Sequence, residues 1–132
     1  MSRAISLVLL LVIGLGLVAG SLVWTIDRRR AIETAEAVTG GNVERGEAGL
    51  FAYGCIGCHN IPGVRLARGK VGPKLDDLRE RIYIAGVLAN TPDNLALWIQ
   101  HPQWVDPKTA MPETGIGPQD ARDVAAFLYS RR

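Results

Sequence analysis

Two cysteines and a histidine stand together in the segment Cys55-Ile56-Gly57-Cys58-His59, and this C-x-x-C-H spacing is the attachment signature of c-type haem. Two thiols three positions apart can form thioether bonds to the two vinyl groups of haem, and the adjacent imidazole can donate a nitrogen to the iron. The pattern therefore predicts one covalently bound haem c, attached through Cys55 and Cys58, with His59 as an iron ligand.

Three other uses of these residues have less support. A thioredoxin-like C-x-x-C needs a βαβ setting, and no strand-rich pattern surrounds Cys55. A zinc site needs four ligands, and His101 is the only further His or Cys, in no recognised zinc spacing. A disulfide between the only two cysteines would close a loop too short to stabilise the fold much.

A bound haem needs either a second axial ligand or an open iron site, and the candidates for the ligand are Met111, His101 and Met1. Met111 stands in the Pro-rich loop from Pro107 to Pro112, where its polar neighbours make a core role unusual. His101 ends a predicted helix, a position where such a side chain commonly caps backbone carbonyls. We therefore expect Met111 to be the distal ligand.

Hydrophobic residues make up 48% of the chain and are concentrated at its start. From Ala4 to Ile26 there are 23 residues without a charge. As a helix they would reach about 35 Å, enough for a hydrocarbon core of about 30 Å. The alternative is a cleaved signal peptide, but the apolar run is longer than is usual for one, and Trp24 stands where an interfacial aromatic residue would. We expect residues 1–27 to be a retained transmembrane anchor.

The rest of the chain predicts a linker, 28–41, with a polar helical extension, followed by an all-α domain over residues 42–132. Gly40 and Gly41 break the extension, and Asn42 is a plausible N-cap for a helix that leads to Cys55. Residues 60–77 read as loop, with a possible short helix over 78–83. Two further helices are expected, over about 91–101 and from Gly117 to the C-terminus, and no alternating strand pattern competes.

Several motifs follow one another in this domain: Phe51-x-x-x-Cys55-x-x-Cys58-His59, Gly72-Pro73-x-Leu75, Arg81, Leu95-x-x-Trp98-Ile99-x-x-Pro102 and Pro107-x-x-x-Met111-Pro112. In this order they resemble a class I cytochrome c domain, from about Asn42 to Tyr129. More narrowly, Ala85-Gly86-x-Leu88-x-Asn90-Thr91-Pro92-x-Asn94-Leu95 is similar to the haem c domain of subunit II in caa3-type cytochrome oxidases. In this sequence a single predicted span, rather than a copper-binding cupredoxin module, stands before that domain.

The resemblance implies a fold in which crossing N- and C-terminal helices surround one haem. His59 would be the proximal ligand, its other ring nitrogen held by the carbonyl of Pro73, and Met111 would be the distal ligand. Arg81 would pair with one haem propionate and Thr109 would hydrogen-bond the other.

The same resemblance places three aromatic residues. Trp98 would stand near the methionine sulfur, where mitochondrial-type cytochromes have Tyr. Phe51 and Phe127 would meet in the core, where the terminal helices cross.

The predicted topology contains a conflict. Arg28, Arg29 and Arg30 follow the span, whereas only Arg3 precedes it, so the positive-inside rule would leave the domain in the cytoplasm. In families with this motif, haem is attached on the outer face of the membrane. We give weight to the motif and expect a single-pass protein of the bacterial inner membrane, with its haem domain on the periplasmic side.

With both axial positions filled, the iron would change oxidation state rather than bind a substrate, so we expect an electron carrier and not an enzyme. The expected partners are a quinol-oxidising complex and a terminal oxidase. The alternative is a haem c subunit of a periplasmic dehydrogenase, and a ligand-binding sensor or peroxidase would require a site free of Met111. No nucleic-acid partner is expected.

Basic residues in the predicted loop form either a docking patch for acidic partners or a solvated surface: Arg65, Arg68, Lys70 and Lys74.

Overall fold

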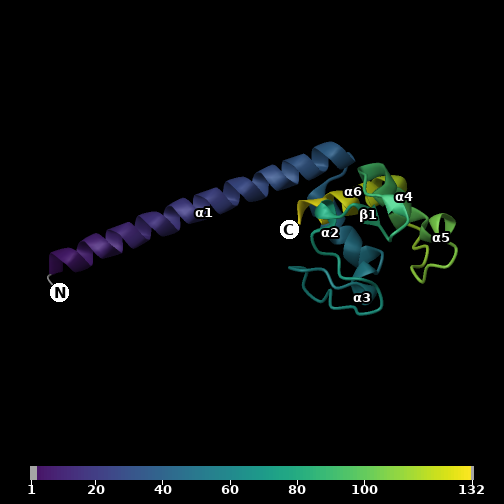
Figure 1. The fold of residues 1–132 in the computed structure, drawn as a ribbon, viewed down its shortest axis with the longest axis horizontal. Helices are drawn as coiled ribbons and strands as arrows, with labels where there is room; N and C mark the ends of the chain where they lie inside the picture. Colours follow the sequence, from purple (N-terminus) through teal and green to yellow (C-terminus); the bar gives the residue numbers. More distant parts are fainter. Residues whose placement is uncertain (1–2, 132) are drawn as a thin grey trace. The chain divides into compact units, whose positions relative to one another are not determined.

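The computed structural model describes residues 3–131, and its chain divides into two compact units, Met1–Arg30 and Ala31–Arg132. Most of the described residues are helical (Figure 1). Each unit is described by itself below.

The first unit lies within helix α1, Arg3–Thr39, which contains an 18-residue stretch of mean hydropathy 2.6 with exposed apolar side chains. By length and composition this stretch could cross a membrane, although a signal sequence would have the same properties. It is therefore consistent with a single-pass protein; residues 1 and 2 of the predicted anchor lie outside the described residues. The guanidinium of Arg28 lies 5.5 Å from the centre of the Trp24 ring, a cation–π contact that occupies one of the three arginines after the span.

The last turns of α1 belong to the second unit, which therefore begins before Asn42. Ala35 and Thr39 are buried, and the Thr39 carbonyl accepts a hydrogen bond of 3.0 Å from Nη1 of Arg122. The helix ends at Thr39 because Gly40 follows in the left-handed region, with φ of 67°.

Helices α2, Val43–Ala52, and α6, Pro118–Ser130, pack against each other most closely in the second unit. Glycines of α2 allow this approach. A Cβ atom at Gly46 would lie 2.9 Å from Cβ of Phe127, and one at Gly49 would lie 2.9 Å from Cγ2 of Val124. Small residues therefore bring the two backbones together.

The expectation that Phe51 is a core residue is wrong. Phe51 is 43% exposed, whereas Leu50 and Phe127 are buried. Neighbouring residues on a helix point in directions about 100° apart, so only one of Leu50 and Phe51 can face α6. Gly54, with φ of 73°, then turns the chain out of α2 before Cys55.

The all-α prediction also needs one correction. Strands β1, Tyr83–Ile84, and β2, Leu88–Ala89, form a short antiparallel hairpin in which Tyr83 pairs with Ala89. Its turn places Ala85 and Gly86 at positive φ. Strands of two residues are too short for an alternating pattern to reveal them. The helix predicted around 78–83 is shorter than expected, a 3₁₀ turn η1 over Leu78–Glu80.

The remaining helices are α3, Cys55–Cys58, α4, Pro92–Gln100, and α5, Pro102–Val105. Thr91 caps α4 by accepting a hydrogen bond from the backbone N–H of Asn94. Helix α5 was not expected, because the sequence after Pro102 reads as loop. Helix α4 packs on α6, and together with α2 they form a core that includes Leu50, Leu95, Ile99, Val124 and Leu128.

Candidate functional site

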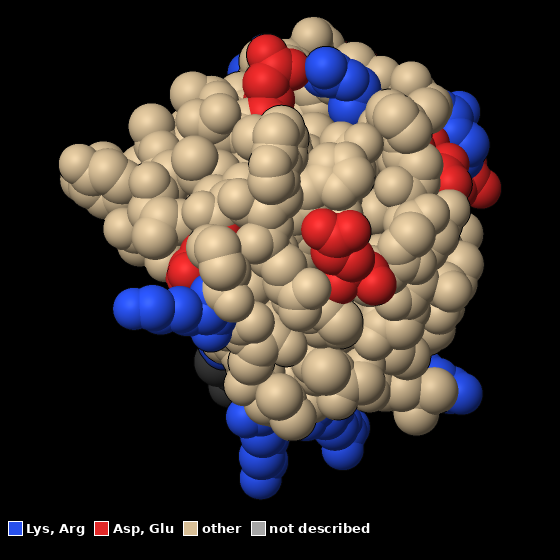
Figure 2. All heavy atoms as spheres, turned by 90° about the vertical axis from the view of Figure 1, so that its right-hand side faces the viewer, with Lys and Arg blue, Asp and Glu red and all other residues tan. Residues whose placement is uncertain are grey.

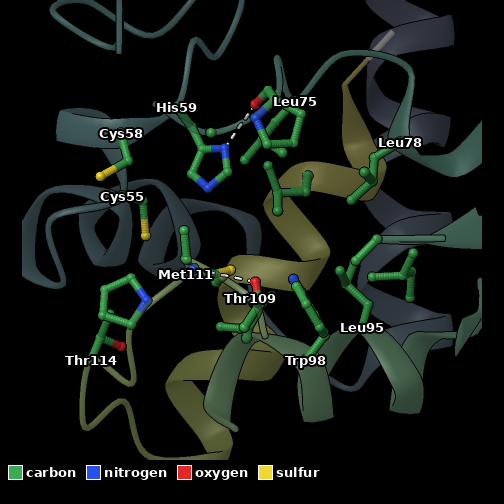
Figure 3. A pocket seen from close by; sticks show the side chains of 18 of the residues that line it. Cys55, Cys58, His59, Leu75, Leu78, Leu95, Trp98, Thr109, Met111 and Thr114 are labelled. Atoms are coloured by element: carbon green, nitrogen blue, oxygen red, sulfur yellow. Dashed lines mark hydrogen bonds between the residues drawn. The ribbon is translucent and has the colours of Figure 1, made fainter. Parts of the chain in front are cut away.

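A cavity of about 410 Å³ opens between α3, the loop after it, α4 and the loop before α6 (Figure 3). All eight residues that the sequence analysis selects as cofactor-binding line this cavity: Cys55, Cys58, His59, Pro73, Arg81, Trp98, Thr109 and Met111. Residues up to 56 positions apart in the chain are thus brought to one place, and the volume lies in the range of small-molecule sites, about 300–1,000 Å³.

His59 follows directly after α3 and is held by its neighbours. Its backbone N–H donates to the Cys55 carbonyl at 3.0 Å, and its ring Nδ1 lies 2.8 Å from the Pro73 carbonyl oxygen. A Cβ atom at Gly72 would lie 2.7 Å from the same Nδ1, so the loop backbone passes directly against the ring. Since Nδ1 is engaged, Nε2 is left to face the cavity (Figure 3).

Cys55 and Cys58 are not joined to each other, and both thiols are partly buried. Helix α3 is a single turn, which places the two side chains on the same side of the cavity (Figure 3). Burial raises the pKa of the Cys55 thiol. At neutral pH Cys55 is therefore a protonated thiol that is accessible from the cavity.

Met111 lies across the cavity from His59 (Figure 3). A turn holds it: the Thr109 N–H donates to the Asp106 carbonyl at 3.0 Å, and the Met111 N–H donates to Oγ1 of Thr109 at 3.2 Å. These two hydrogen bonds fix the backbone of the loop from which the Met111 side chain reaches the cavity.

The other two candidates for the distal position, His101 and Met1, are not among the described residues that line the cavity. His101 does not line the cavity; its Nδ1 lies 3.8 Å from a carboxylate oxygen of Glu113, and its ring meets Trp104 edge-on with centroids 6.0 Å apart. Met1 lies outside the described residues. Met111 is thus the one candidate that the described residues bring to the cavity.

Arg81 and Trp98 also line the cavity. Trp98 is partly buried and packs against the core. Arg81 donates from Nη2 to the Lys74 carbonyl, the Asp76 carbonyl and the Asp76 carboxylate, at 2.8, 3.1 and 3.0 Å. The sequence analysis missed Asp76, although its place between Lys74 and Arg81 in a charged segment is a signal that could have indicated a partner.

The residues present fit a haem. An imidazole nitrogen and a thioether sulfur lie on opposite sides of the cavity, and two thiols lie along one side. A guanidinium, that of Arg81, lines the cavity and is partly exposed, which puts it at the rim. The walls between them are apolar: Leu75, Leu78, Ile84, Leu95, Ile99 and Leu128. Within residues 3–131, no three side chains of His, Cys, Asp or Glu come together as a zinc site made by this chain would need.

The charges around the site are unevenly distributed. In Figure 2 several Lys and Arg side chains extend from the lower edge, the side on which α3 and the following loop lie in Figure 1, whereas the rest of the face shown carries scattered side chains of both signs. Arg65, Arg68 and Lys70 of that loop are exposed and form no ion pair with a described residue. Lys74 differs, because its Nζ lies 2.7 Å from the Asp76 carboxylate. The predicted patch therefore has three uncompensated cations rather than four.

Comparison with known proteins finds similarity to part of a larger respiratory protein. The chain is 37% identical over 79 residues to cytochrome c oxidase subunit 2 of Bacillus sp. (strain PS3), covering 58% of this chain and 22% of that protein. It is 36% identical over 77 residues to cytochrome c oxidase subunit 2 of Alkalihalophilus pseudofirmus, with the same two coverages. The match thus spans about a fifth of the length of these relatives. No family model matches the chain. No solved structure matches it either.

Proposed function

We propose that this chain is a membrane-anchored c-type cytochrome that transfers single electrons in a respiratory chain, as a tethered carrier or an oxidase-associated subunit. The observation that carries the proposal is the placement of His59 and Met111 on opposite sides of one cavity, with Cys55 and Cys58 along its side. Proteins with a class I cytochrome c fold have this arrangement, and the close packing of α2 on α6 supports that fold here.

When bound, haem c would supply a one-electron redox couple at its iron. The chain's own residues would set the conditions for it. The Pro73 carbonyl holds the His59 ring in one tautomer and one orientation, so that Nε2 is the nitrogen left for the iron. Met111 would occupy the position opposite His59 and so keep small molecules from binding there.

The walls of the cavity would serve electron transfer in two further ways. Their apolar side chains exclude water from the site, which lowers the local dielectric constant. The turn that holds Met111 and the contact that holds His59 fix both side chains, so little rearrangement would accompany a change of oxidation state. A rigid site of this kind suits a carrier rather than an enzyme that must bind and release a substrate.

The similarity to cytochrome c oxidase subunit 2 supports a place next to a terminal oxidase, with electrons arriving from a quinol-oxidising complex. It favours this role over that of a dehydrogenase subunit. In the proposed arrangement residues 1–27 anchor the protein in the inner membrane, and residues 42–132 bind haem on the periplasmic side. Residues 28–41 connect the two, and their part from Ala31 onwards belongs to the compact second unit. Tethering would raise the effective concentration of the carrier near partners in the same membrane.

Covalent haem attachment tests the proposal. Full-length protein purified in mild detergent should contain one haem per chain that acidified organic solvent does not extract, whereas the double variant Cys55→Ala/Cys58→Ala should release its haem. Haem that stays attached in the double variant, or wild-type protein without haem, would contradict the proposal. Identifying the chains that copurify would separate the two partner classes, because oxidase subunits support the proposed role and a dehydrogenase supports the alternative.

A further inference from the structure

Arg81 is held in place by the protein itself. Its backbone carbonyl accepts a hydrogen bond of 2.7 Å from Nδ2 of Asn90, whose Oδ1 in turn accepts one of 2.6 Å from the Tyr129 hydroxyl. Its Nη2 donates to the segment of Lys74 and Asp76. Its Nε and Nη1 donate to no described residue. Since Arg81 lines the cavity and its side chain is partly exposed, these groups are available to a ligand at the cavity rim.

Asp76 joins two cations beside the cavity. One carboxylate oxygen lies 2.7 Å from Nζ of Lys74 and the other lies 3.0 Å from Nη2 of Arg81. The hydrogen bond from Lys74, reinforced by Arg81, lowers the pKa of Asp76, which is therefore ionised at neutral pH. All three side chains are one third to one half exposed, so solvent weakens the attraction, and the main effect of Asp76 is on geometry and local charge.

We propose that Asp76 is a positioning residue of the cofactor site: it fixes the Arg81 guanidinium at the cavity rim and offsets its charge, so that bound haem has a lower redox potential than it would without Asp76. The inference rests on the proposed function. Its physical basis is that a nearby anion favours the ferric over the ferrous state, whereas Arg81 and Lys74 without their partner would favour the ferrous state. The same carboxylate would direct the free Nε and Nη1 towards a haem carboxylate.

Asp77 provides a matched control. It carries the same charge at the next position, and its side chain forms no ion pair or hydrogen bond with a described residue. Its backbone is in the left-handed region, with φ of 43°, which Asn tolerates well. Asp77→Asn therefore removes one charge from the segment without changing the contacts of Arg81.

The experiment measures the midpoint potential of haem-loaded, full-length protein in detergent. Asp76→Asn should raise the potential, Asp77→Asn should raise it less, and Asp76→Glu should stay near the wild-type value. Equal shifts in Asp76→Asn and Asp77→Asn would overturn the inference and leave the proposed function standing, whereas wild-type protein without haem would overturn both. If Asp76→Asn gives no holoprotein, Asp76→Ser, which also removes the charge, provides the same comparison.

A double-mutant cycle separates positioning from charge alone. Arg81→Lys keeps the charge but loses the planar guanidinium that Asp76 and the two carbonyls hold. In that background Asp76→Asn should shift the potential no more than Asp77→Asn does. A potential shift as large as that of Asp76→Asn in the wild-type background would mean that Asp76 acts through its charge only, which would contradict the positioning role.

Discussion

Gly72 and His59 are in such close contact that the loop has no room for a side chain, because a Cβ atom at Gly72 would lie 2.7 Å from Nδ1 of His59. The same nitrogen lies 2.8 Å from the Pro73 carbonyl. The position of the His59 imidazole therefore depends on the absence of a side chain at Gly72.

Replacing this glycine should displace the His59 ring that its backbone touches. Gly72→Ala should push the ring off the Pro73 carbonyl and destabilise the holoprotein by about 1–3 kcal/mol, as overpacking usually does. The expected readouts are a lower yield of haem-loaded protein and a Tm lower by at least about 4 °C. Gly57→Ala is the control, since a Cβ atom there meets nothing within 4 Å. Equal losses in the two variants would show that the contact with His59 has no special role.

Met111 should determine the spectrum of the ferric protein. Met111→Ala should abolish the sulfur-to-iron charge-transfer band at the red edge, lower the potential and let carbon monoxide bind the reduced protein. His101→Ala should change none of these, because His101 lies outside the cavity. Loss of the band in His101→Ala, with the band retained in Met111→Ala, would reverse the assignment.

Asp123 should stabilise the junction between α2 and α6. This buried carboxylate accepts hydrogen bonds from the Asn42 N–H at 2.8 Å, from Nε of Arg45 at 2.6 Å and from the Gln119 amide at 3.0 Å. Asp123→Asn should lower the free energy of unfolding by about 2 kcal/mol in denaturant titrations. Asp93→Asn, which breaks an exposed ion pair with Arg122, should cost no more than about 1 kcal/mol. Equal effects would contradict a structural role for Asp123.

The effect of Asp123 should also depend on pH. Burial alone would raise its pKa, but hydrogen bonds from Arg45, Gln119 and Asn42 outweigh burial and lower the pKa below its ordinary value. The stabilisation is therefore complete above the unfolded-state value of about 3.9 and is lost as pH falls through the folded-state pKa. The stability difference between wild type and Asp123→Asn should be constant from pH 5 to 8, about the range of greatest stability, and shrink in stronger acid. A difference that grows on acidification would contradict this sign.

The basic loop should control the rate of electron transfer with charged partners. Neutralising Arg65, Arg68 and Lys70 together should slow oxidation of the reduced protein by ferricyanide, a small anion, and flatten its dependence on ionic strength. Reduction of the ferric protein by a cationic ruthenium hexaammine should become faster. The potential should stay nearly unchanged. The double variant Arg65→Lys/Arg68→Lys keeps the charge and should keep the wild-type rates. Wild-type rates in the variant that neutralises all three residues would show that electrons leave the protein elsewhere.

Sequence reasoning succeeded best where the chemistry of a residue type limits its use. The chain has only two residues each of Cys, His and Met, so few of them could bind a cofactor. Cys55, Cys58, His59 and Met111 line one cavity even though the segments between them are irregular. Helices α2, α4 and α6 were also predicted, because their start signals and apolar spacing are local.

The failures concern packing and very short elements. Phe51 and Leu50 are both apolar neighbours on α2, so spacing alone does not resolve which of them faces α6. The hairpin of β1 and β2 is too short to produce a pattern. The pairing of Asp76 with Lys74 and Arg81 depends on how the loop folds back, and charges spaced over a short segment are more often a solvated surface.

The packing of α2 against α6 has a consequence for the order of events during synthesis. Gly46 meets Phe127, and the Asn42 N–H binds the carboxylate of Asp123, 81 residues later in the chain. A growing chain can therefore not close this domain until its last helix has been made, which at about 5–20 residues per second leaves several seconds after the cysteines emerge. In the proposed function, the segment from Cys55 to His59 would therefore stay accessible for haem attachment until α6 packs against α2.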